Sequence, residues 1–279
     1  MRLSRAGWLL KSYERLKKME TDKEYHGKAG EYLSSSLLKH YIKCPAYYKR
    51  VIDGEVERKD SDAFKFGRAA HCYILEGANA FNDNYVVGGG PINPKTEKPF
   101  GEQTKKYKEW LAEQTCDVVN DKMFDTILRM DEEIRKSEYY HIINDGEPEV
   151  VVRGEYLGRK CQIRMDILNN SVDQGIIADL KTCDDLDRFE RDAARFGYFT
   201  QFAFYREIYK NECYGCIPHF FVFAIEKKEP FRCGVFKVSG ETLDQVAETN
   251  KATILDLIES EKTGVFKTGY EELRFLERI

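Results

Sequence analysis

Helical spacing of apolar residues dominates the first half of the chain. Ser34-Ser35-Ser36 offers N-cap residues for a helix that places Leu37, Leu38 and Tyr41 on one face. This helix should end near Cys44-Pro45, because the residue before a proline disfavours helical geometry. Helices are predicted in this half over about 34–44, 62–76, 104–114 and 121–137.

A stretch rich in glycine and proline separates the second of these helices from the third. Gly77 is the expected end of the second helix, and residues 82–106, which include Gly88-Gly89-Gly90-Pro91, are predicted to form one irregular loop. Loops of this length in compact domains are more often functional or mobile than idle.

Strand-like patterns replace helical spacing from about residue 149. Strands are predicted over about 150–152, 161–168, 176–181, 219–226 and 231–238. Two further helices are predicted, over about 187–209 and 241–262. This order predicts an α/β core with a helical N-terminal portion. We interpret residues 34–279 as one domain and residues 1–33 as a peripheral segment with a helix and a flexible approach.

Composition and charge narrow the class of protein. The 279 residues are 42% hydrophobic and 33% charged, which fits a folded core under a strongly solvated surface. No apolar run approaches the roughly 20 residues of a membrane helix, and the run after Arg2 and Arg5 ends too early for a secretory signal. We therefore expect a cytoplasmic protein with no membrane partner. The net charge of −4 argues against a broad non-specific DNA-binding surface but allows a local basic channel.

Eight cysteines are scattered along the chain. Cys213 and Cys216 have ligand-like spacing, but no second pair accompanies them, and reduced structural thiols are the expected state. Whether these two residues bind anything stays open.

Candidate chemistry centres on two predicted strands. Asp179 and Lys181 flank Leu180, so their side chains should share one face of a strand, and Asp166 ends the preceding strand. Two carboxylates that converge repel each other, and a bound Mg²⁺ or Mn²⁺ removes the repulsion. Lys181 could then orient an attacking water and help to deprotonate it. The alternative is a surface ion pair at a strand end.

Three residues on predicted helices could join this site. Gln201 and Tyr205 are spaced i,i+4 and could line a phosphate-binding site, although Tyr205 could equally be a packing residue. His71 lies among small residues that allow close approach, and a neutral imidazole can bind a metal. A lone helical histidine is more often a core or surface residue.

The motifs together resemble the RecE-like branch of the PD-(D/E)xK nucleases, the phage-type exonucleases related to RecB nuclease domains. The matching segments occur in the family's order and span roughly residues 34–225. They are Ser34 to Leu38 with Tyr41, Cys44-Pro45 and Tyr48; Phe66 to His71; Asn93 to Gly101 with Thr104-Lys105 and Trp110; Arg164-Met165-Asp166; Asp179 to Thr182; and Gln201 to Tyr205. Met165 stands where relatives often have proline.

The resemblance implies a restriction-endonuclease-like core, with a mixed central sheet flanked by helices. It implies that His71, Asp166, Asp179 and the Leu180 carbonyl hold Mg²⁺, with Mn²⁺ as substitute, and that Lys181 serves the water. Gln201 and Tyr205 become the family's helix motif beside the scissile phosphate.

The same resemblance implies an exonuclease acting on double-stranded DNA ends in a bacterial or phage-infected cell. Ring-shaped homo-oligomers and a single-strand annealing partner in recombination are typical of this branch. Two alternatives remain: a structure-specific or CRISPR-adaptation-type nuclease, and a DNA-binding module that does not cut. An iron–sulfur cluster, as in some RecB-like relatives, would favour the former, with Cys44, Cys213, Cys216 and Cys233 as its candidate ligands.

Basic residues could track DNA phosphates beside such a site. They occur in the first helical region and around the irregular loop: Lys39, Lys43, Lys49, Arg50, Lys95, Lys98, Lys105 and Lys106. We hypothesise that residues 88–101 contact the DNA end. The alternative for any one of these residues is a solvated surface position.

Overall fold

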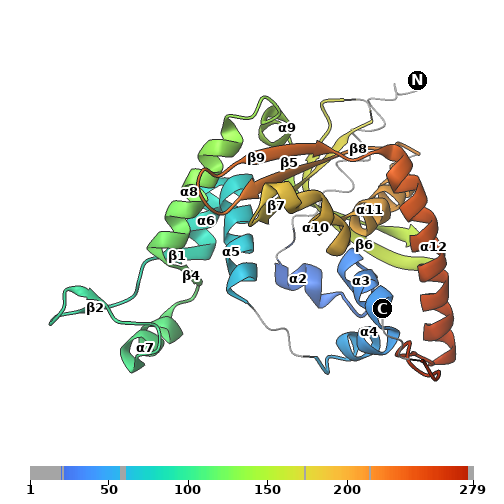
Figure 1. The fold of residues 1–279 in the computed structure, drawn as a ribbon, viewed down its shortest axis with the longest axis horizontal. Helices are drawn as coiled ribbons and strands as arrows, with labels where there is room; N and C mark the ends of the chain where they lie inside the picture. The colour runs from blue at the N-terminus through green and yellow to red at the C-terminus, as the bar shows by residue number, and fades with distance from the viewer. Residues whose placement is uncertain (1–19, 21, 57–60, 173, 214, 276–279) are drawn as a thin grey trace.

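A five-stranded mixed sheet forms the centre of the molecule (Figure 1). The computed structural model describes residues 20, 22–56, 61–172, 174–213 and 215–275. The strands, in spatial order, are β5 (Glu147–Tyr156), β6 (Arg159–Asn169), β7 (Ile176–Cys183), β8 (His219–Glu226) and β9 (Cys233–Lys237). Neighbouring strands are antiparallel except for β7 and β8, which are parallel. The predicted mixed sheet is therefore confirmed.

Helices cover both faces of the sheet, because the strands carry apolar side chains on each side. One face packs against α3 (Ser35–Lys43), α4 (Pro45–Ile52), α11 (Tyr198–Glu212) and α12 (Gly240–Thr263). The other packs against α5 (Asp62–His71), η1 (Cys72–Glu76), α6 (Gly77–Asn84), α8 (Asp121–Arg135) and α9 (His141–Asn144). The result is a three-layer α/β/α arrangement, as the predicted fold class requires.

Helix boundaries follow local signals that the apolar spacing only partly revealed. Ser34 caps α3 by accepting a hydrogen bond from the Leu37 N–H, and α3 ends at Lys43 as predicted. A helix that the sequence analysis missed, α4, then begins at Pro45, because proline suits a first helical position.

Two predicted helices are interrupted. The helix predicted over 62–76 changes to π-helical geometry directly after His71, and Gly77, with φ of 91°, starts α6 instead of ending the helix in a loop. The helix predicted over 187–209 begins as η2 (Leu186–Arg188) and continues directly as α10 (Phe189–Arg195). Gly197, which has a left-handed φ of 66°, then separates α10 from α11.

The stretch predicted to be irregular, 82–106, is structured in part. Strand β1 (Tyr85–Val87) pairs in parallel with β4 (Asp117–Val119) and forms the base of an arm, which we define as residues 88–116. The arm consists of the hairpin of β2 (Ile92–Asn93) and β3 (Lys98–Pro99) and of helix α7 (Lys105–Glu113). Figure 1 shows it projecting away from the three layers.

Most of the predicted peripheral segment, and with it the helix expected near the start of the chain, falls outside the described residues. In its described part, α2 (Asp22–Gly27) precedes Leu33, whose backbone pairs with β6 beside Cys161. None of the described helices combines the length and the apolar character needed to cross a bilayer.

Candidate metal centre

The site forms where strands β6 and β7 separate. Their register pairs Ile167 with Ala178 and continues only toward Asn169 and Ile176, so the ladder ends next to Asp166. Beyond this point the Asp166 side chain replaces the missing backbone partner: its Oδ2 accepts a hydrogen bond from the Leu180 N–H at 2.9 Å. A carboxylate thus lies in the opening between two strands of the central sheet.

Strand β6 changes its side-chain alternation at the same residue. Ile163 and Met165 belong to the core on the α11 side, whereas Ile167 belongs to the core on the α5 side. Since a regular strand places residues i and i+2 on one face, the phase shifts at Asp166. This irregularity lets Asp166 occupy the opening instead of either core.

The neighbouring strand β5 is irregular at the residue opposite Asp166. Pro148 pairs with Ile167 and Val150 with Met165, which leaves Glu149 facing Asp166 outside the ladder. Glu149 has a left-handed φ of 54°, a conformation that costs a non-glycine residue on the order of 1 kcal/mol or more. The fold holds this strained backbone beside a second carboxylate.

His71 completes a cluster of possible metal ligands. It ends α5, which can approach the sheet closely because Ala69 and Ala70 are fully buried small residues. Its Nδ1 lies 3.5 Å from Asp166 Oδ2, and one ligand atom each from His71, Glu149 and Asp166 lie within 4.8 Å of one another. Within the described segments no other group of three such side chains meets this criterion.

Asp179 and Lys181 lie beside this cluster on the α11 side. They are within β7, which continues to Cys183, so the expectation of a strand end is wrong. The side chain of Asp179 is only 3% exposed and forms an ion pair with the Lys181 ammonium. Burial and the nearby Asp166 carboxylate raise the pKa of Asp179. Burial lowers the pKa of Lys181, but the Asp179 and Asp166 carboxylates together raise it by more, so the pKa lies above its ordinary value.

The donor set fits a hard divalent cation. Carboxylate oxygens and one imidazole suit Mg²⁺ and Mn²⁺, and a cation would offset the repulsion between Asp166 and Asp179. Apart from its ion pair with Lys181, Asp179 Oδ2 is buried without a hydrogen-bond partner among the described residues. The residues present therefore match the group that the sequence led us to expect.

The two residues of the predicted helix motif make different contacts. Gln201 lies at the site, and its Nε2 donates a hydrogen bond to Asp179 Oδ1 at 2.9 Å. Tyr205 is buried, and its hydroxyl donates to the Arg164 carbonyl oxygen at 2.8 Å. Tyr205 therefore fixes β6 two residues before Asp166, whereas Gln201 contacts a candidate ligand directly.

Glu149 was missed by the sequence analysis. The sequence did offer one sign of it, because Glu149 is an acidic residue directly before the predicted strand Val150-Val151-Val152. Its left-handed backbone, however, could not be predicted from the residue types. Glu149 Oε2 forms an ion pair with Arg164 Nε at 2.9 Å. The Arg164 guanidinium in turn lies 5.0 Å from the centre of the Tyr25 ring. The described part of the N-terminal segment thus reaches the surroundings of the site.

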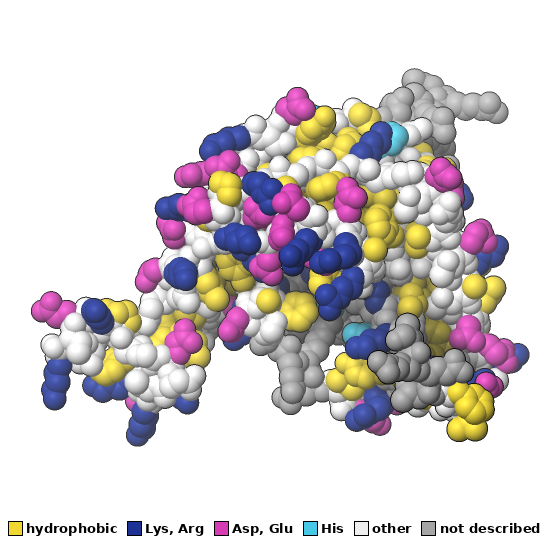
Figure 2. Space-filling model, viewed as in Figure 1, with side chains coloured by type: hydrophobic (Ala, Val, Ile, Leu, Met, Phe, Trp, Pro, Cys, Tyr) yellow, Lys and Arg dark blue, Asp and Glu magenta, His cyan; other side chains and the backbone are white. Residues whose placement is uncertain are grey.

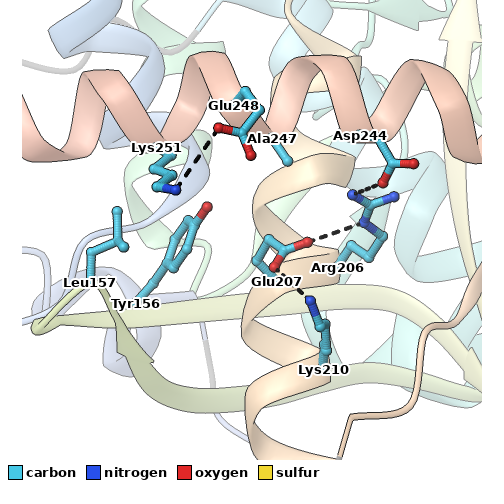
Figure 3. Close-up of a pocket in the computed structure, with 9 residues that line it drawn as sticks. All are labelled: Tyr156, Leu157, Arg206, Glu207, Lys210, Asp244, Ala247, Glu248 and Lys251. Carbon is cyan, nitrogen blue, oxygen red and sulfur yellow. Dashed lines mark hydrogen bonds and ion pairs between the residues drawn. The ribbon is translucent and has the colours of Figure 1, made fainter.

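Two other features lie apart from this centre. Among the candidate iron–sulfur ligands, Cys216 lies just before the start of β8, whereas Cys233 pairs with Ile225 near the other end of this strand, so these two cysteines lie at opposite ends of β8. The pocket drawn in Figure 3 is lined by residues of α11, α12 and the β5–β6 turn. Its α11 residues Arg206 and Lys210 lie on the helix face opposite Gln201, and its charged side chains pair with one another.

The fold and the site define a PD-(D/E)xK-type protein. The family described as "PDDEXK-like domain of unknown function (DUF3799)" matches residues 34–272, and the chain belongs to this family. No match was found among curated proteins.

One solved structure agrees with this chain at the level of fold. A candidate exonuclease from Eubacterium rectale has a similar structure, with a TM-score of 0.66, 20% identity, and coverage of 94% of this chain and 96% of that one. The structure of SSO0001 covers 89% of this chain at 13% identity, but its TM-score of 0.34 is too low to indicate a shared fold.

Proposed function

We propose that this protein is a metal-dependent deoxyribonuclease that hydrolyses phosphodiester bonds from the ends of double-stranded DNA. The observation that carries the proposal is the convergence of His71, Glu149 and Asp166 beside the Asp179–Lys181 pair, in a chain of the PDDEXK-like family. The exonuclease description of the similar structure and the resemblance to RecE-like enzymes support the choice of substrate.

In this proposal His71, Glu149, Asp166, Asp179 and the Leu180 carbonyl hold Mg²⁺, or Mn²⁺ as its substitute. A bound ion of this kind polarises a phosphodiester and lowers the pKa of water. Lys181, held by Asp179, orients the attacking water. Gln201 keeps Asp179 Oδ1 in place, and Tyr205 holds the backbone before Asp166.

The arm is proposed to contact the DNA duplex. It carries Lys95, Lys98, Lys105, Lys106 and Lys108, and Figure 2 shows basic side chains along its lower edge. Its base is tied to the helix that carries His71, since Arg68 on α5 forms an ion pair with Asp117 on β4 at 3.5 Å. A duplex bound along the arm would therefore lead toward the candidate metal centre.

Assembly and biological role extend the proposal. By the same resemblance, the protein forms a ring-shaped homo-oligomer and supplies single-strand overhangs to an annealing protein during recombination. Multi-angle light scattering at micromolar concentration tests the ring, and a monomer with full activity would remove this part of the proposal.

One assay tests the proposed activity. End-labelled linear duplex and closed circular duplex are incubated with Mg²⁺ and with wild type, Lys181→Ala or the control Lys237→Ala, which changes an exposed lysine of the same sheet. We expect wild type and the control to digest linear DNA only, and Lys181→Ala to digest neither. Equal cutting of circles would show an endonuclease. No cutting together with no Mn²⁺ binding in calorimetry would indicate a DNA-binding module.

A further inference from the structure

Lys39, on α3, is a second lysine at the candidate metal centre. Its Nζ lies 3.3 Å from Gln201 Oε1 and 3.4 Å from the Phe196 carbonyl oxygen. Two lysines thereby flank one aromatic ring: Nζ of Lys39 and of Lys181 lie 5.8 Å and 5.1 Å from the centre of the Tyr198 ring. Lys39, Gln201, Asp179 and Lys181 form one continuous polar chain.

The Lys39 ammonium has no carboxylate within ion-pair distance among the described residues, in contrast to Lys181, which is paired with Asp179. An ammonium has three N–H donors, and the two contacts found here go to neutral oxygens. Burial and the neighbouring Lys181 ammonium lower the pKa of Lys39 to about 8, against the opposing effect of Asp179. The described part of the chain therefore leaves this cation without a counter-charge at the edge of the site.

Close packing keeps Lys39 in this position. Gly197 has a left-handed φ of 66°, and a Cβ at this residue would lie 3.3 Å from Lys39 Cδ. The side chain thus passes over the break between α10 and α11. The contact with Lys39 also fixes the amide of Gln201, because an ammonium can only face the amide oxygen, and this leaves Nε2 for Asp179.

We propose that Lys39 binds a non-bridging oxygen of a substrate phosphate next to the candidate metal centre, and that the same ammonium keeps Gln201 oriented toward Asp179. This inference rests on the proposed nuclease function. An anionic phosphate would supply the missing counter-charge to Lys39 and would lie near both lysines that flank Tyr198.

The test compares Lys39→Met and Lys39→Arg with Lys237→Met, which changes an exposed lysine of β9 to which no DNA contact is assigned. For Lys39→Met we expect kcat/KM on linear duplex to fall at least 10-fold, with partial recovery in Lys39→Arg and no change in Lys237→Met. We also expect the slope of log affinity against log salt concentration, measured by anisotropy of an end-labelled duplex in Ca²⁺, to fall by about one.

A melting curve separates a phosphate contact from a structural role. Because Lys39 is largely buried and has no carboxylate partner in the described part of the chain, Lys39→Met should melt at or above the wild-type temperature at pH 7. Melting well below wild type with a parallel loss of activity would overturn the proposal, as would kinetics and salt dependence equal to those of Lys237→Met. If wild type cuts no DNA, the proposed nuclease function is wrong. The salt dependence of DNA binding and the melting curve then still test whether Lys39 binds a phosphate.

Discussion

Replacement of Lys181 by methionine tests whether the Asp179–Lys181 pair is as buried as the structure shows. Methionine keeps the apolar stem of the lysine but removes the charge, which leaves a carboxylate with 3% side-chain exposure next to Gln201 and Asp166. Removing one partner of a buried ion pair typically destabilises a protein by about 3–5 kcal/mol.

Protonation of Asp179 sets an upper bound on this loss. At pH 7 the cost of protonating an ordinary aspartate is about 1.4 kcal/mol for each of roughly three pH units, or about 4 kcal/mol. In the variant the folded state would keep a proton that the unfolded chain releases, so stability falls as the pH rises above the ordinary aspartate pKa. The deficit against wild type should therefore be at most about 4 kcal/mol at pH 7 and at most about 1.5 kcal/mol at pH 5.

Urea unfolding followed by circular dichroism, with EDTA present, measures this effect. The matched control is Asp179→Asn with Lys181→Met, a neutral pair of similar volume in which the introduced amide oxygen can still accept a hydrogen bond from Gln201. We expect the double variant to recover to within about 1 kcal/mol of wild type, since neutral replacement of a buried pair costs little. A single variant as stable as wild type, or a double variant as unstable as the single one, would refute the assigned burial and pairing.

Four further predictions concern the ligands, the arm, the helix break and Lys39. Glu149→Gln should weaken Mn²⁺ binding about 10–100-fold in calorimetry, whereas the exposed Glu155→Gln should not; equal affinities would exclude Glu149 as a ligand. A Gly-Ser linker in place of residues 89–116 should leave the melting temperature nearly unchanged and raise KM for linear duplex; unchanged digestion would exclude the arm from DNA binding. Gly197→Ala should cost roughly 1 kcal/mol in urea unfolding, because alanine is strained at a φ of 66°; no loss would contradict that backbone. In the folded protein the pKa of Lys39 is about 8, below its ordinary value of 10.5. The stability of wild type relative to Lys39→Met should therefore increase as the pH rises from about 8 to 10. A stability difference between the two proteins that does not change with pH would contradict the burial of Lys39.

The mixed sheet and the residues around Asp166 were predictable from sequence because both depend on short-range patterns. Alternation put Asp179 and Lys181 on one face, and strand order brought Asp166 to the same region. The structure adds that they meet at an opening in the sheet. The roles assigned to His71, Gln201 and the Leu180 carbonyl stay predictions that the metal and activity assays test.

Glu149 and Lys39 show what residue patterns could not supply. The position of Glu149 depends on a left-handed backbone that a glutamate rarely adopts, at a point where the pairing of β5 with β6 is interrupted. Lys39 is far from Gln201 in sequence, and their contact depends on the helix break at Gly197. The same break, together with the π-helical turn after His71, also accounts for the helices that were predicted too long.

The separation of β6 and β7 has a consequence for when the chain can act. The side chains around that opening come from α5, three adjacent strands and α11, so the last of them leaves the ribosome long after the first. A nascent chain lacking α11 has neither Gln201 beside Asp179 nor the Tyr205 anchor on β6. A nuclease of the proposed kind would thereby remain inert during synthesis and become competent only once the whole sheet has assembled.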